Sequence, residues 1–112
     1  MNIIFQNQKT EKCFSDYNKL KKLIPFEWVK TIKKIINQLE AANCFGDYLT
    51  LGLNHPEQIN QNGGTFYSLR ITANVRLIIK LNSSINEINE CTEIEIQGVC
   101  DYHGDKSNWF IP

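Results

Sequence analysis

Three ionisable side chains stand next to one another where the last apolar stretch of this 112-residue chain runs out: Asp101, Tyr102 and His103. The imidazole of His103 exchanges protons near neutral pH, so it is a candidate general acid or general base. Tyr102 is suited to stack on a nucleobase or to assist proton transfer. Three adjacent polar side chains are costly to bury and are not needed to end a strand. Two interpretations stay open: an ordinary solvated terminus, or the part of the protein that does the chemistry.

Two arginines, Arg70 and Arg76, lie on either side of a short turn between strands predicted over 65–71 and 75–81. A three-residue loop, with Asn74 able to adopt a left-handed conformation, pairs Arg70 with Arg76 across the two strands. A two-residue loop would place the two arginines on opposite faces of the sheet. We favour the three-residue loop because it separates the basic residues from the apolar ones, which then gather on the other face.

Opposed guanidinium groups repel each other unless they share an anion, and their planar forks match the oxygens of a phosphate. Neutralisation of the two arginines by Glu93 or Glu95, from the next strand, is an equally weighted alternative. Metal-free RNA cleavage needs a base for the 2′-hydroxyl, an acid for the leaving 5′-oxygen and positive charge for the phosphorane. His103 and the arginine pair provide such groups if they converge on one face of the sheet.

Two amphipathic helices precede these strands. Apolar residues recur at helical spacing from Cys13 to Ile24, with Thr10 as a candidate N-cap. The first helix is expected to stop before Pro25, which disfavours helical geometry at the residue in front of it. Pro25 then suits the first turn of a second helix, whose wide apolar stripe ends near 43–46.

The remaining pattern completes a mostly antiparallel sheet. An apolar run over 3–5 predicts a first strand, and alternation over 92–102 predicts a last one, with Gly98 as a candidate bulge. The polar stretches 54–64 and 82–92 are predicted to be exposed connections. The order β-α-α-β-β-β predicts an α+β fold with helices packed on one face of the sheet.

The length predicts a single domain over 1–112 with a short C-terminal tail over 104–112. The tail holds three consecutive apolar residues, Trp109, Phe110 and Ile111. We expect them to fold back onto the core or onto an open sheet edge. A platform for nucleobases or for a partner is the less favoured interpretation.

The composition is ordinary for a globular protein, with 42% apolar and 21% charged residues. The formal net charge is zero, which gives no overall attraction to nucleic acid. Residues 1–56 hold eight lysines against five acidic residues, and we interpret them as solvated helix faces, with a weak basic patch as the alternative. No run of about 18 apolar residues and no signal-peptide pattern occurs, so we expect a cytoplasmic protein without a membrane span.

The four cysteines include no Cys-x-x-Cys pair and are interpreted as reduced, mostly buried thiols. A zinc site built from Cys91, Cys100 and His103 is a minor alternative, because their spacing matches no standard set of ligands. We therefore expect no metal and no cofactor.

The segments "GTFYSLRITANVRLIIK" and "EIEIQGVCDYH" resemble the RelE/ParE superfamily of bacterial toxins, and within it the HigB-like plasmid-maintenance killer proteins. The resemblance covers about a third of the chain. The positions that match are Gly64, Tyr67, Ser68, Arg70, Arg76, Asp101, Tyr102 and His103.

The resemblance implies a microbial ribonuclease that cuts mRNA on the translating ribosome and is held inactive by a cognate antitoxin, often a helix-turn-helix protein. Carried over to this chain, it implies that Arg76 stabilises the phosphate and that Asp101, Tyr102 and His103 form the catalytic cluster. Arg70 is then a supporting substrate contact, and Lys80 and His55 are further candidate substrate contacts.

Two other functions stay open on the same fold. A gyrase-directed toxin needs no Asp-Tyr-His cluster, and a degenerate toxin would only bind an antitoxin-like protein.

Overall fold

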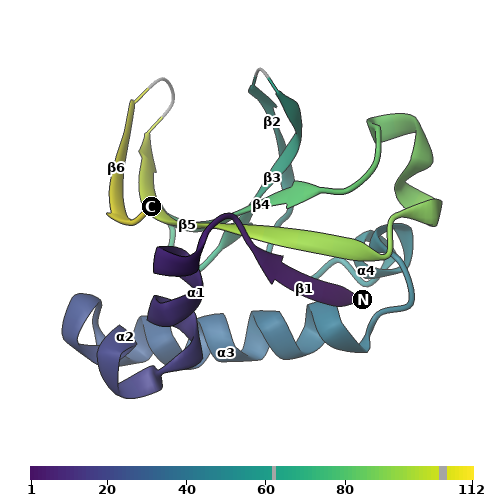
Figure 1. Ribbon diagram of the computed structural model, residues 1–112. Helices are drawn as coiled ribbons and strands as arrows, with labels where there is room; N and C mark the ends of the chain where they lie inside the picture. Colours follow the sequence, from purple (N-terminus) through teal and green to yellow (C-terminus); the bar gives the residue numbers. More distant parts are fainter. Residues whose placement is uncertain (62, 104–105) are drawn as a thin grey trace.

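The computed structural model of the chain describes residues 1–61, 63–103 and 106–112, without the side chains at 60, 61, 85, 102, 103, 106 and 107. Its strands form one six-stranded sheet in the order β1-β5-β4-β3-β2, with β6 paired to the C-terminal part of β5 (Figure 1). Only β1 and β5 run parallel among these pairs. The strands are β1 (Asn2–Phe5), β2 (Glu57–Gln61), β3 (Gly64–Arg70), β4 (Val75–Leu81), β5 (Glu93–His103) and β6 (Lys106–Ile111).

Helices α1, α2 and α3 lie on one side of the sheet, which confirms the predicted α+β architecture (Figure 1). A short helix, α4, and a 3₁₀ helix, η1, were not predicted, and they contact each other beside the sheet. The helices are α1 (Gln8–Ser15), α2 (Tyr17–Leu23), α3 (Phe26–Ala41), α4 (Phe45–Thr50) and η1 (Ile85–Glu90).

The predicted first helix is in fact two helices, because Asp16 interrupts it. Asp16 has an extended backbone, and its carboxylate accepts hydrogen bonds from the backbone N–H groups of Asn18 and Lys19, so it caps α2. The N-cap of α1 is Asn7 and not Thr10: the Oδ1 atom of Asn7 accepts a hydrogen bond from the backbone N–H of Thr10. The helix is therefore interrupted at this cap, although the apolar residues continue at helical spacing on both sides of it.

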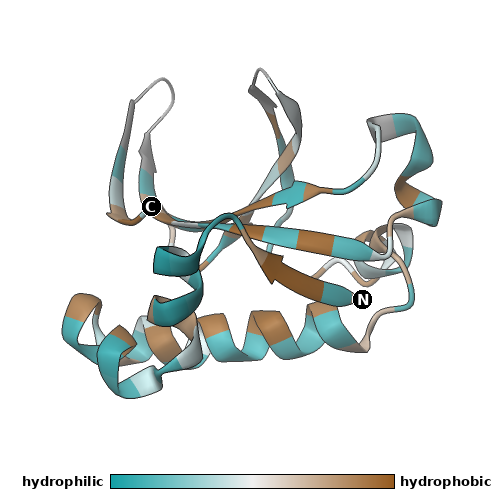
Figure 2. Ribbon diagram, in the orientation of Figure 1, coloured by the Kyte–Doolittle hydropathy of each residue, from teal (hydrophilic) through white to brown (hydrophobic). Residues whose placement is uncertain are grey.

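The main core lies between α3 and the sheet. Helix α3 follows Pro25 and ends at Ala41, close to its predicted end. Along β5, apolar residues turned toward the helices alternate with Glu93 and Glu95, as predicted. Figure 2 shows the same alternation of brown and teal on β5 and a recurring apolar side on α3. Fully buried residues of this layer are Ile32, Ile35, Leu39, Leu69, Leu77, Ile79, Ile94 and Ile96.

The stretch 54–64, predicted to be a loop, contains strand β2. Its polar composition hides a strand because Ile59 is the one buried residue among the side chains of β2 that the structure describes. Ile59 packs with Phe66 on the face of the sheet away from the helices. The loop that leads into β2 does turn sharply. Asn54 and His55 have φ values of 62° and 45°, in the left-handed region that few residues other than glycine adopt.

The connection 82–92 is likewise not simply exposed, since it forms η1 and ends at the buried Cys91. The predicted tail forms β6, so it covers a sheet edge as expected and its Ile111 is buried in the core. Strand β5 consequently continues through His103, whose backbone pairs with Lys106, instead of ending before that histidine.

The predicted bulge at Gly98 is confirmed, because the β4–β5 register shifts between the pairs Ile78–Gly98 and Ile79–Ile96. Any side chain at Gly98 would collide with the carbonyl group of Ile111, so the close approach of β6 requires glycine here. The turn between β3 and β4 has a different stabiliser from the predicted one. Asn74 is not left-handed; instead the Thr72 hydroxyl accepts hydrogen bonds from the N–H groups of Asn74 and Val75.

Candidate functional site

The face of the sheet away from the helices, the open face, carries three of the candidate residues: Arg70, Arg76 and Lys80. In the observed register Arg70 pairs with Arg76, which confirms the predicted pairing of the two arginines. Arg76 in turn pairs with Cys100 of β5, and Cys100 pairs with Trp109 of β6. These residues form one row across four strands, because directly paired residues point to the same face. The hairpins β2–β3 and β5–β6 both rise from the sheet on the side away from α3 (Figure 1).

Arg76 is buried, with only 8% of its surface exposed. Its Nη2 atom donates a hydrogen bond of 3.2 Å to the carbonyl of Ala73. Its Nε and Nη1 atoms are buried and have no hydrogen-bond partner among the described residues, and the same holds for Nε of Arg70. A buried charge with unsatisfied donors is costly unless an opposite charge completes it. The arrangement is therefore suited to take up an anion.

The two glutamates weighed as neutralising partners are engaged elsewhere. Glu93 accepts hydrogen bonds from the side-chain amides of Asn2 and Asn82, at 3.2 and 3.0 Å. Glu95 accepts one of 2.8 Å from Gln97 and pairs across the sheet with Lys80. Neither glutamate forms an ion pair with an arginine within the described part of the chain.

Arg70 is held from the helical side by an unusual loop residue. The backbone N–H of Arg70 donates a hydrogen bond of 2.7 Å to the carbonyl of Asn54. The side-chain amide of Asn54 donates to the Tyr48 hydroxyl and to Oε1 of Gln38, both at 2.7 Å. Burial raises the pKa of Tyr48, and the hydrogen bond from Asn54 acts in the opposite direction. The left-handed turn at Asn54 thus connects the arginine pair to α3 and α4.

One residue of the open face, Glu57, was missed by the sequence reasoning because β2 was taken for a loop. Glu57 pairs directly with Ser68, so its exposed carboxylate lies on the face that carries Arg70, two residues further along β3. Ser68 is fully buried, and its Oγ has no hydrogen-bond partner among the described residues. The alternation of Glu57 with Ile59, opposite Ser68 and Phe66, is the signal that identifies Glu57.

Lys80 and His55 occupy different surroundings. Lys80 pairs with Phe66 on the open face, and its Nζ lies 5.8 Å from the centre of the Phe66 ring. It stands four residues after Arg76 along β4, at the far end of the same face. His55 is exposed at the left-handed turn just before β2.

The terminal cluster is only partly described. Asp101 pairs with Val75, whose side chain belongs to the core between the helices and the sheet. The register therefore puts Asp101 on the opposite face from Arg76. The side chains of Tyr102 and His103 lie outside the described residues, and their convergence with the arginines stays a prediction.

Cys100, next to Arg76, is an inert thiol rather than a nucleophile. Burial, assisted by the nearby carboxylate of Asp101, raises the pKa of Cys100 to about 11, although Arg76 acts in the opposite direction. At neutral pH the thiol is therefore protonated. Cys91 lies in the helix-side core and Cys100 in the open-face cluster, so the two belong to different packing groups. Among the described residues no group of three or more His, Cys, Asp or Glu residues is arranged to hold a metal ion.

None of the helices in the described parts of the chain has the length and apolar character needed to cross a bilayer.

No protein-family model matches the sequence, and no curated protein matches it. Two solved structures do. The YoeB dimer from Staphylococcus aureus is 23% identical over 92% of this chain and 97% of that chain, with a TM-score of 0.56. The YoeB–YefM complex from Staphylococcus aureus matches with 23% identity, the same coverage and a TM-score of 0.55. At this identity the likeness shows the fold, and the chain has the fold of YoeB.

Proposed function

We propose that this protein is the toxin of a type II toxin–antitoxin system and that it cleaves mRNA, using the open face of the sheet as its active site. One observation carries the proposal: Arg76 is buried on that face with Nε and Nη1 unsatisfied among the described residues, directly opposite Arg70. A phosphodiester supplies the oxygen atoms that such a pair of guanidinium groups lacks.

Two further observations support the proposal. YoeB, whose fold this chain has, is a RelE-family toxin and has been solved in complex with YefM. Independently, the residues around Arg70 and Arg76 and the Asp-Tyr-His cluster resemble the RelE/ParE superfamily, in its HigB-like branch. A cognate antitoxin of the helix-turn-helix type is the expected partner, and mRNA on a translating ribosome in the cytoplasm is the expected substrate.

The mechanism follows from the charges on the open face. Arg76 and Arg70 bind the scissile phosphate and stabilise the additional negative charge of the phosphorane. The exposed carboxylate of Glu57 can act as the general base that accepts the proton of the attacking 2′-hydroxyl. We assign protonation of the leaving 5′-oxygen to His103 and stacking on a base to Tyr102. Asp101 contributes indirectly, through the residues next to it in the sequence.

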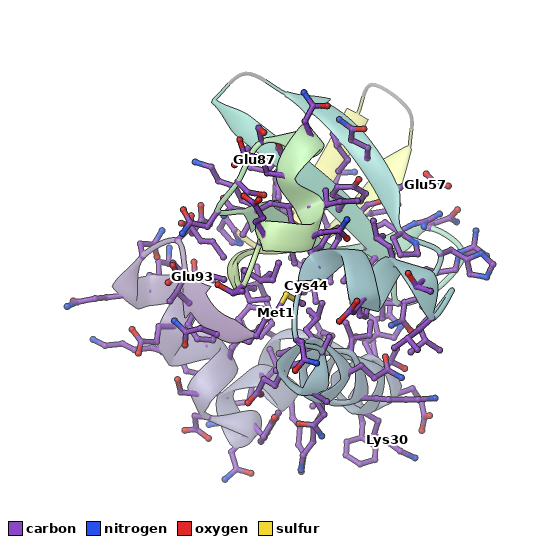
Figure 3. All side chains as sticks on the ribbon, turned by 90° about the vertical axis from the view of Figure 1, so that its right-hand side faces the viewer. Met1, Lys30, Cys44, Glu57, Glu87 and Glu93 are labelled. Carbon is purple, nitrogen blue, oxygen red and sulfur yellow. The ribbon has the colours of Figure 1, made fainter. Side chains whose placement is uncertain are left out.

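Induction of the gene in bacteria, followed by mapping of mRNA 5′ ends, tests this function. We expect growth arrest and new 5′ ends with the wild type, and neither with Arg76→Ala or His103→Ala. Glu57→Gln is expected to slow cleavage by about 10²-fold or more, since it removes a general base. Lys30→Ala, an exposed change on α3 far from Glu57 (Figure 3), is the matched control and should behave as wild type.

Other outcomes identify the alternatives. Growth arrest with a DNA-damage response and intact mRNA would indicate a gyrase-directed toxin. No arrest by the wild type would indicate a protein-binding module without activity. Full mRNA cleavage by both Arg76→Ala and His103→Ala would refute the proposed site.

A further inference from the structure

A small pocket of about 250 Å³ opens on the face of the sheet that carries the arginine pair. Its floor is apolar, formed by Ile78 and by Phe66, which is only 8% exposed. The amide side chains of Gln6 and Gln97 lie at its rim. An apolar pocket with a few polar groups at its edge is the usual form of a site for a small flat ligand.

Trp109 makes one wall of this pocket. The tryptophan remains 42% exposed although it belongs to a strand of the sheet. Its ring lies close to Gly98, because a Cβ atom built on that glycine would lie 3.0 Å from Cζ3 of Trp109. Gly98 therefore leaves room for the indole to lie against the sheet beside Ile78, which is the cross-strand partner of Gly98.

The pocket adjoins the arginine pair along the strands. Ile78 lies two residues after Arg76 on β4, and Trp109 shares a row with Arg76 through Cys100. Two strand spacings separate the backbones of Trp109 and Arg76, a distance of about 10 Å. One polymeric ligand can therefore place a charged group on the guanidiniums and a ring in the pocket at the same time.

We propose that the pocket binds a nucleobase of the RNA, stacked on Trp109, next to the phosphate held by Arg76 and Arg70. The proposal rests on the proposed function and adds to it the residues that recognise the base. Charge complementarity favours RNA over an apolar peptide side chain, because the arginine pair lacks an anionic partner among the described residues and an RNA chain joins flat aromatic rings to phosphates. The Nε2 groups of Gln6 and Gln97 already donate hydrogen bonds within the protein, so the two rim amides offer their oxygen atoms as acceptors for the edge of a base.

The neighbouring residue provides a matched control. Phe110 is 40% exposed, almost as much as Trp109, but its ring packs edge-on against Trp28 of α3, with ring centroids 5.2 Å apart. The two aromatic residues thus follow each other on β6 and face opposite sides of the sheet. Removal of Phe110 changes the exposed aromatic surface of the strand without touching the pocket.

Fluorescence anisotropy with two labelled hexadeoxynucleotides tests the proposal, since DNA lacks the 2′-hydroxyl and is not cleaved. One oligonucleotide carries adenine at every position, and the other has the same phosphates but no bases at its two central positions. Wild type and Phe110→Ala should bind the base-bearing strand at least about fivefold more tightly than the abasic one. Trp109→Ala should bind both equally, and Trp109→Phe should restore most of the preference.

Equal binding of the two oligonucleotides by the wild type overturns the proposal, and so does a preference that Trp109→Ala retains. Thermal unfolding of each variant distinguishes a lost contact from a lost fold. Mapping of mRNA 5′ ends in induced cells separates the two proposals. If the wild type cleaves mRNA but Trp109 makes no difference to base binding, only the nucleobase pocket falls. If the wild type cleaves no mRNA, the proposed function falls.

Discussion

The two faces of the sheet differ in how their buried polar groups are hydrogen-bonded. On the helix side, the hydroxyl of the fully buried Tyr48 accepts a hydrogen bond from the side-chain amide of Asn54, which also donates to Gln38. On the open face, Ser68 Oγ and two nitrogen atoms of Arg76 are buried without a hydrogen-bond partner among the described residues. Buried polar groups without partners are suited to be completed by a ligand. We therefore propose that the helix side serves stability and the open face serves binding.

The largest effect on stability is expected on the helix side. Leu77 is fully buried in the centre of β4, and Leu77→Ala should lower the free energy of unfolding by about 3 kcal/mol because it leaves a cavity. Urea denaturation monitored by circular dichroism measures the change. The exposed substitution Lys30→Ala is the control, with an expected change below about 0.5 kcal/mol. A loss for Leu77→Ala as small as that of the control would show that the helix-side core is not the main source of stability.

The next effect has the opposite sign. Arg76→Met keeps much of the buried volume and removes a charge with unsatisfied donors, so we expect the free energy of unfolding to stay the same or rise by about 1–2 kcal/mol. Growth arrest on induction should be abolished by the same change. The same urea titration, with an induction assay beside it, checks both. Strong destabilisation by Arg76→Met would mean that the arginine serves the fold rather than a ligand.

A pair of hydroxyl deletions compares the two faces more finely. Tyr48→Phe removes an acceptor of a buried hydrogen bond and should cost about 1 kcal/mol. Ser68→Ala removes a buried hydroxyl that has no partner among the described residues, so it should be neutral or slightly stabilising. Thermal unfolding of both variants under one condition gives the comparison. Equal losses for the two would erase the distinction drawn between the faces.

A further effect concerns pH. Burial raises the pKa of the Cys100 thiol from 9.0 to about 11, so folding favours its protonated form. The stability that this provides is complete below pH 9 and is lost as the pH rises through 11. Unfolding free energies of wild type and Cys100→Ala, measured from pH 8 to pH 11, should therefore converge at the alkaline end. Burial also raises the pKa of Tyr48 and Tyr67, but both proteins share these groups, so their difference isolates the thiol. Parallel pH curves would contradict the effect.

The sequence was informative where the pairing of two strands separates apolar from basic residues. Alternation along β4 and the position of the short turn were sufficient to predict that Arg70 faces Arg76, because any other register exposes the apolar residues. The same reasoning failed for β2, where Ile59 alone is buried among the described side chains, and with β2 it missed Glu57. The break at Asp16 was missed because a capping carboxylate interrupts a helix without interrupting its apolar spacing.

The open face could be predicted only in part. Its arginines were identifiable from their positions. The burial of Arg76, with Nε and Nη1 unsatisfied among the described residues, depends on Phe66, Ile78 and Cys100 packing around that face. The wall supplied by Trp109 depends on a tail that pairs with β5 and on the absence of a side chain at Gly98. Such features arise from contacts between strands distant in sequence, which local patterns do not encode.

The most direct test of the open face as an anion site is the stability of the folded protein in inorganic phosphate. Thermal midpoints (Tm) of wild type and Arg76→Met are compared as phosphate replaces chloride at constant ionic strength. A ligand that binds only the folded protein raises Tm in proportion to its site occupancy, whereas the general salting-out effect of phosphate acts on both proteins alike. We predict a saturating rise for the wild type beyond the rise of the variant. Identical rises in the two proteins would contradict an anion site at Arg76.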